Sequence, residues 1–138
     1  MSDATRSGRG RGNVTIEEYI QMMDRWPDSW MGFPEDLRIG REITAVFLPF
    51  VEYMIAQGLS RRTIRRHVDN LWALGGELIR AVNFDQSLRE RPARTLVEDS
   101  IDSTGGPLLG SAFSEQEQNP FDATCRKLHR FFSSCNHA

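Results

Sequence analysis

The stretch from Gly58 to Ile79 reads GLSRRTIRRHVDNLWALGGELI and decides the fold class. Its apolar residues recur at steps of four, three, three and four, the spacing of one face of an α-helix: Ile64, Val68, Leu71, Leu74 and Leu78. Ser60, which precedes them, is a favoured N-cap residue. The pattern predicts a long amphipathic helix that buries one face and exposes its arginines and Asp69 on the other.

The residues before this helix predict a second long helix. Pro34 suits the first turn of a helix, and apolar residues follow at helical spacing from Ile39 to Ile55. Gly58 stands where a glycine commonly ends a helix. Pro49 lies inside the run, and because an interior proline costs about 3 kcal/mol, we expect a kink or break just before it.

The N-terminal part predicts a tail, a short helix and a linker. Residues 1–13 are mostly Gly, Ser and Arg without apolar periodicity, so we expect a disordered basic tail. Thr15 and Glu18 form a capping box, which predicts a helix as far as about Arg25. Residues 26–34, WPDSWMGFP, are predicted to be a turn-rich linker whose aromatic rings fold back onto the core.

The C-terminal half predicts two further helices. Pro92 begins the first, and the sequence TGGP at residues 104–107 ends it. Asn119 as N-cap and Pro120 in the first turn predict the second. Its apolar stripe is Phe121, Cys125, Leu128 and Phe132. Since no segment alternates apolar and polar residues convincingly, we predict one all-α domain over residues 14–138, a bundle of about five helices.

Length and composition suit one globular domain: the chain has 138 residues and a net charge of −2. No apolar run approaches the ~18 residues of a membrane span, and the N-terminus has no apolar stretch typical of a secretory signal. We therefore expect a cytoplasmic protein that does not bind membranes. Its two cysteines, Cys125 and Cys135, are expected to be reduced thiols.

Charge is distributed in blocks that the total conceals. Residues 59–95 carry eight arginines against four acids, whereas residues 96–122 carry six acids and no base. A near-neutral total therefore does not exclude a polyanionic partner. Arginine binds phosphate in a bidentate manner, although a genome-wide codon bias would produce the same excess of arginine over lysine.

Four arginines crowd the first two turns of the helix after Ser60: Arg61, Arg62, Arg65 and Arg66. Cations there oppose the helix macrodipole at about 0.3–1 kcal/mol each at low salt, so compensation is needed. One source is local, because Asp69 is within reach of Arg65 and Arg66. The other is external, because a capped helix N-terminus surrounded by guanidinium groups suits phosphate. The alternative is a solvated basic face.

The same region resembles a known family. An aromatic helix, then Gly-Leu-Ser, then a basic helix containing Thr-Ile is similar to the SAM-like core-binding domain of phage integrases and other tyrosine recombinases. The matching positions are Phe50, Tyr53, Met54, Gly58, Leu59, Ser60, Thr63, Ile64 and His67, within about residues 40–80. The resemblance implies a small helical bundle that clamps DNA through its backbone. Integrase chemistry resides in a second domain, so we expect no strand transfer from this chain.

Our leading hypothesis is a non-catalytic module that binds nucleic acid, DNA above all, through its phosphates. Its contact residues would be Ser60, Arg61, Arg62, Thr63, Arg65 and Arg66, with Arg6, Arg9 and Arg11 of the tail as looser contacts. The alternative is a small protein-interaction module, an adaptor or an inhibitor encoded by a mobile element or phage. It would use Trp26, Trp30 and Phe33, or the acidic residues 96–122, as its contact surface.

Enzyme signatures are missing from the sequence. It contains no glycine-rich phosphate loop with a lysine, no His-Glu-x-x-His and no Gly-x-Ser-x-Gly, so we expect neither catalysis nor a cofactor. Cys125, His129, Cys135 and His137 are possible zinc ligands by residue type. Their spacing fits no common zinc finger, and Cys125 lies on an apolar stripe, so we predict a buried thiol and no metal site.

Overall fold

The computed structural model describes residues 14–110 and 113–136. These residues form six α-helices and one 3₁₀ helix: α1 (Ile16–Met23), α2 (Trp26–Trp30), α3 (Asp36–Ala56), α4 (Arg61–Phe84), η2 (Gln86–Glu90), α5 (Ala93–Ser100) and α6 (Glu115–Asn136). Within those ranges there is no β-strand, only an isolated bridge between Asp102 and Gly105. The predicted all-α helical bundle is confirmed. The tail predicted over residues 1–13, with Arg6, Arg9 and Arg11, lies outside the described residues.

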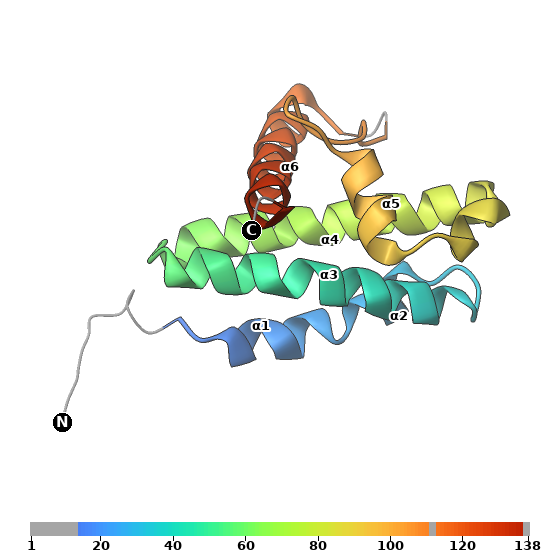
Figure 1. Ribbon diagram of the computed structural model, residues 1–138, viewed down its shortest axis with the longest axis horizontal. Coiled ribbons are helices and arrows are strands. Elements are labelled where there is room, and N and C mark those ends of the chain that lie inside the picture. Colours follow the sequence, from blue (N-terminus) through green and yellow to red (C-terminus); the bar gives the residue numbers. More distant parts are fainter. Residues whose placement is uncertain (1–13, 111–112, 137–138) are drawn as a thin grey trace.

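The long helices α3 and α4 form an antiparallel pair at the centre of the molecule (Figure 1). Helices α1 and α2 pack on one side of α3, whereas α5 and α6 lie on the other side, with α6 crossing the pair. The apolar stripe predicted for α4 is buried in this arrangement, as are the apolar faces of α3 and α6. One core therefore runs through the whole bundle and fixes how the helix ends meet at the surface.

A tight turn joins α3 to α4 and positions the basic end of α4. Gly58 has a φ of +78°, and its N–H donates to Ile55 O at 2.9 Å, while Leu59 N donates to Met54 O at 3.4 Å. This pairing is the Schellman motif that a glycine after a helix end favours, as the sequence predicts. Ser60 is the N-cap of α4, also as predicted. The arginine-rich first turns of α4 therefore start directly at an exposed corner.

The predicted bounds of α3 are wrong at two places. The helix begins at Asp36 rather than at Pro34, and it continues unbroken through Pro49. Pro49 is an exposed residue, as is Ala45, whose carbonyl loses its N–H partner to the proline. Phe47 and Phe50 are fully buried on either side of it. Burial of this continuous apolar face outweighs the cost of the proline.

The predicted linker over residues 26–34 contains a helix instead, α2. Trp26 and Trp30 are four residues apart and therefore share a helix face, where their ring centroids lie 5.7 Å apart. Pro27 sits in the first turn, which tolerates proline. The prediction that these rings cover the core is correct for both tryptophans, which are buried.

Helix α6 begins one turn earlier than the sequence predicts. It starts at Glu115, so Asn119 is not its N-cap and Pro120 lies inside the helix. Ser114 and Glu117 explain the earlier start, because Ser114 N donates to Glu117 Oε1 at 3.1 Å. This is half of a capping box, formed by a hydroxyl residue and a glutamate, like the box of Thr15 and Glu18 at the start of α1.

Candidate nucleic-acid interface

Ser60 and Thr63 form two hydrogen bonds with each other at the start of α4. Ser60 Oγ accepts a hydrogen bond from Thr63 N at 3.1 Å and donates one to Thr63 Oγ1 at 3.0 Å. Both side chains are half-buried. These two residues therefore cap the helix, and any contact with a phosphate depends on the arginines around them.

Arg61 is held by a carboxylate from another helix. Its Nη1 lies 2.5 Å from Glu18 Oε1, while Glu18 Oε2 accepts the N–H of Thr15 in the α1 capping box. The hydrogen bond from Arg61, together with that from Thr15, lowers the pKa of Glu18. Because both side chains are about half exposed, the pair contributes little to stability. It does neutralise Arg61 and tie α1 to the start of α4.

Arg65 also has a partner, whereas the prediction that Asp69 serves both Arg65 and Arg66 is wrong. Arg65 Nε lies 3.0 Å from Asp69 Oδ1, four residues further along α4. Asp69 is rotated from Arg66 by about 60° around the helix axis, toward the side on which Arg65 lies. The local compensation expected from the sequence therefore reaches one arginine only.

Arg62 and Arg66 form no ion pair with any of residues 14–110 and 113–136. They are exposed and stand one turn apart on the outward ridge of α4. Asn70, one further turn along the same ridge, contacts α6. The four arginines thus divide into a neutralised pair facing α1 and a free pair that leads toward α6.

A groove lies on the α1 side of this ridge. It has a volume of about 460 Å³ and is lined by Tyr19 and Met22 of α1 and by charged residues of both helices: Glu18, Arg61, Arg62 and Arg65. Since two of its three arginines are already paired with carboxylates, Arg62 is the cation that this groove offers to a ligand.

On the other side of the ridge, α4 is bound to α6 by a polar cluster that the sequence did not predict. Thr124 is buried, and its Oγ1 lies 2.7 Å from His67 Nδ1 and 2.9 Å from Asn70 Nδ2. Asn70 also donates to Pro120 O at 3.2 Å. Thr124 lies more than fifty positions from its partners, so no local spacing indicates the contact.

The aromatic surface proposed for a protein partner is wrong in part. Trp26 and Trp30 are only 6% and 9% exposed. The Trp30 indole N–H donates to Trp72 O at 3.0 Å, which fixes the ring between α2 and α4. Phe33 is 50% exposed, as the hypothesis requires. The exposed apolar side chains on this end of the molecule also include Met31 and Phe84, which the sequence did not single out.

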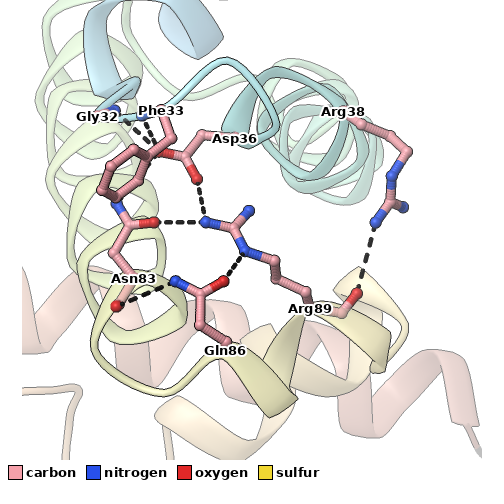
Figure 2. A network of polar contacts seen from close by, with 7 residues as sticks. All are labelled: Gly32, Phe33, Asp36, Arg38, Asn83, Gln86 and Arg89. Carbon is pink, nitrogen blue, oxygen red and sulfur yellow. Dashed lines mark hydrogen bonds and ion pairs between the residues drawn. The ribbon is translucent and has the colours of Figure 1, made fainter.

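A buried ion pair holds the same end together (Figure 2). Asp36 accepts hydrogen bonds from the N–H groups of Gly32 and Phe33 and from Asn83 Nδ2, at 2.8 to 3.1 Å. Arg89 Nη2 lies 2.7 Å from Asp36 Oδ1. Burial alone would raise the pKa of Asp36. The hydrogen bonds from these donors together have a larger effect in the opposite direction, so the pKa is lowered overall. Both oxygens of Asp36 and both the oxygen and the nitrogen of the Asn83 side chain have partners in this network, which indicates a structural role.

The acidic residues on and after α5 are largely used within the chain. Glu98 and Asp99 pair with Arg94 and Arg91 at 2.9 and 2.8 Å. Asp122 accepts hydrogen bonds from Gly106 N and Gln118 Nε2 at 3.1 and 3.0 Å. The segment at 96–122 therefore offers less free negative charge than its composition suggests.

The four candidate metal ligands do not form a described site. Cys125 is buried on the apolar face of α6, as predicted, and burial together with the charge of Asp122 raises the pKa of its thiol to about 12. Cys135 is exposed, and His137 lies outside the described residues. Among the residues that are described, no three His, Cys, Asp or Glu side chains are placed to hold a metal ion.

Comparisons with known proteins add no relative: no protein-family model matches the chain, and no curated protein or solved structure is significantly similar to it. The resemblance to core-binding domains therefore stays a prediction. In the described part of the chain, no helix combines the length and apolar character that a membrane crossing needs.

Proposed function

We propose that this protein is a non-catalytic helical module that binds nucleic acid through its phosphate backbone. The observation that carries the proposal is the free pair of cations on α4. Arg62 and Arg66 stand one turn apart on an exposed ridge and have no carboxylate partner in the described chain.

Elementary electrostatics supports an external anion at this position. Arg62 lies in the first turn of α4, where the helix macrodipole is already positive and a cation is unfavourable. Glu18, which also borders the groove beside Arg62, pairs with Arg61, and no carboxylate among the described residues forms an ion pair with Arg62. Guanidinium groups bind phosphate with two parallel hydrogen bonds, so a phosphate backbone supplies the missing negative charge.

Binding to a short fluorescein-labelled DNA duplex, measured by fluorescence anisotropy, tests the proposal. For the wild-type protein we expect the logarithm of the affinity to fall linearly with the logarithm of the salt concentration, by ~0.9 for each phosphate contacted. The Arg62→Gln/Arg66→Gln variant should reduce this slope by about 1.8 and weaken binding roughly a hundredfold at about 50 mM salt.

Arg61→Gln/Arg65→Gln is the matched control, because it removes the same charge from the same helix but from the two arginines already paired with Glu18 and Asp69. We expect its effect to be clearly smaller. Equal losses for the two double variants would show a general effect of net charge and contradict the assignment to Arg62 and Arg66. If the wild type binds neither duplex nor single-stranded DNA at about 50 mM salt, the proposal is wrong.

A second candidate function rests on a separate observation, the exposed aromatic side chains at the opposite end of α4. Phe33 and Phe84 are 50% and 93% exposed. The residues that precede them, Gly32 and Asn83, are held together, because Gly32 N and Asn83 Nδ2 both donate to Asp36 Oδ2 (Figure 2). Exposed aromatic side chains at one end of a molecule are typical of a protein-binding surface.

The variant Phe33→Ser/Phe84→Ser tests this second function without disturbing the buried tryptophans. A protein captured from nuclease-treated lysate by the wild type and lost with this variant would support it. Leu108→Ser is the control, because Leu108 is 83% exposed but lies far along the chain from both rings. Capture that disappears after nuclease treatment alone would favour nucleic acid as the partner.

A further inference from the structure

The seam between α4 and α6 brings together cations that are far apart in the sequence. Thr124 of α6 holds His67 and Asn70 of α4 at 2.7 and 2.9 Å, which fixes how the two helices face each other. Lys127 lies one turn after Thr124, rotated by only about 60° around the α6 axis, away from the buried stripe. Arg66 occupies the equivalent position on α4, one turn before Asn70.

The electrostatics of His67 agrees with this placement of both cations. His67 is half-buried, and burial lowers its pKa. The positive charges of Lys127 and Arg66 lower the pKa further, so the histidine lies within range of a cation from each helix. Neither Lys127 nor Arg66 forms an ion pair within the described ranges. The seam is therefore bordered on both sides by uncompensated positive charge.

We propose that Lys127 is a third phosphate-contacting residue and that, with Arg62 and Arg66, it forms one surface across the seam between α4 and α6. This inference rests on the proposed function and specifies the path of the ligand. The nucleic-acid backbone runs along the exposed ridge of α4 from Arg62 to Arg66 and then crosses to α6 at Lys127. The α1 groove then lies beside the path and not on it.

The first test uses Lys127→Gln in the full chain with the same labelled duplex. We expect the salt slope of binding to fall by ~0.9 and the affinity to fall roughly tenfold at about 50 mM salt. Lys127→Arg, which keeps the charge, should retain most of the affinity. Arg126→Gln is the matched control, because Arg126 is the neighbouring residue of α6 but directs its guanidinium to Thr104 O at 3.4 Å.

The second test needs no substitution, because Lys127 is the only lysine of the chain. An amine-acetylating reagent therefore modifies one side chain, with the N-terminal amine as an internal reference. Mass spectrometry should show that the duplex slows acetylation of Lys127 several-fold more than acetylation of the N-terminal amine. This measurement stays decisive if Lys127→Gln proves poorly folded.

The outcomes separate this inference from the proposed function. If the wild type binds and Arg62→Gln/Arg66→Gln does not, but Lys127→Gln matches Arg126→Gln and the duplex does not protect Lys127, the path across the seam is wrong and the binding function stands. If the wild type binds no duplex, both fail. Loss of binding with Lys127→Gln, rescue by Lys127→Arg and protection by duplex would establish the surface.

Discussion

Asp36 illustrates how one residue holds the end of the bundle that carries the exposed phenylalanines. Its carboxylate is 1% exposed and pairs with Arg89, itself mostly buried. Removing one partner of a buried pair typically costs about 3–5 kcal/mol, because the other charge stays buried without compensation. We expect Asp36→Asn to lower the free energy of unfolding by about 3 kcal/mol, measured by urea denaturation followed by circular dichroism.

Asp99→Asn is the control for this prediction, because it breaks the pair with Arg91, in which both side chains are about half exposed. Exposed pairs contribute about 0–1 kcal/mol, so this variant should unfold almost like the wild type. Similar decreases in the free energy of unfolding for the two variants would contradict the prediction that the buried pair of Asp36 contributes more to stability than an exposed pair.

Gly75 and Gly76 are neighbours in α4 with opposite expectations. A Cβ atom on Gly75 would overlap the ring of Trp30, whereas one on Gly76 would lie 3.5 Å from the same ring, an ordinary contact. Gly75→Ala should therefore lower the free energy of unfolding by about 1–3 kcal/mol through overpacking. Gly76→Ala should raise it by up to about 1 kcal/mol, because alanine favours the helix. Urea denaturation measures both effects: the midpoint should be lower than that of the wild type for Gly75→Ala and higher for Gly76→Ala.

At the scale of helices, the docking of α6 on α4 is predicted to depend on pH through His67. Its pKa in the folded protein is lowered by burial and by Lys127 and Arg66. Between this lowered pKa and the ordinary value of about 6.5, the unfolded chain binds more protons than the folded one. The free energy of unfolding should therefore decrease as the pH falls through this window, and the contribution should be complete above it.

The variant His67→Asn isolates this contribution, because an asparagine places a hydrogen-bonding atom near the position of Nδ1 but does not titrate. The difference in unfolding free energy between wild type and variant should change with pH between about 7 and 5. A difference that is independent of pH would show that His67 does not titrate as expected. The lowered pKa values of Asp36 and Glu18 act mainly below their ordinary values of 3.8 and 4.5, and they are common to the wild type and the variant.

Helices with local signals were mostly predictable from the sequence. The start of α6 was wrong although its signal, Ser114 with Glu117, is local, whereas the break predicted at Pro49 was wrong because tertiary packing decides there. Ser60 with Thr63 and the glycine at position 58 act within a few residues, so spacing alone reveals them. The break at Pro49 was wrong because the energy that keeps α3 continuous comes from burial against other helices. Helix α2 was missed because two prolines and a glycine over residues 26–34 conceal the pairing of its two tryptophans.

At the scale of the whole molecule, the sequence predicts the local contacts of the candidate site but not those between residues far apart in the chain. The contact of Arg65 with Asp69 follows from helix spacing. The contact of Arg61 with Glu18 joins residues 43 positions apart, and that of His67 with Thr124 joins residues 57 apart. The sequence therefore predicts the cluster of arginines but not which of them are free. That selection depends on how α1 and α6 pack on either side of α4.

Arg62, in the first turn of α4, is predicted to strengthen ligand binding and to lower the free energy of unfolding of the whole protein. Arg62 opposes the macrodipole and repels Arg65 and Arg66 three and four residues away, and no acid in the described part of the chain forms an ion pair with it. We therefore expect Arg62→Gln to raise the global free energy of unfolding by about 1 kcal/mol at low salt, with the gain shrinking as salt screens the charges. A bound duplex should raise the melting temperature of the wild type and do so much less for the variant. Thermal unfolding with and without duplex, at two salt concentrations, measures both effects. A variant that is less stable than the wild type and equally stabilised by duplex would show that Arg62 serves the fold and not a ligand.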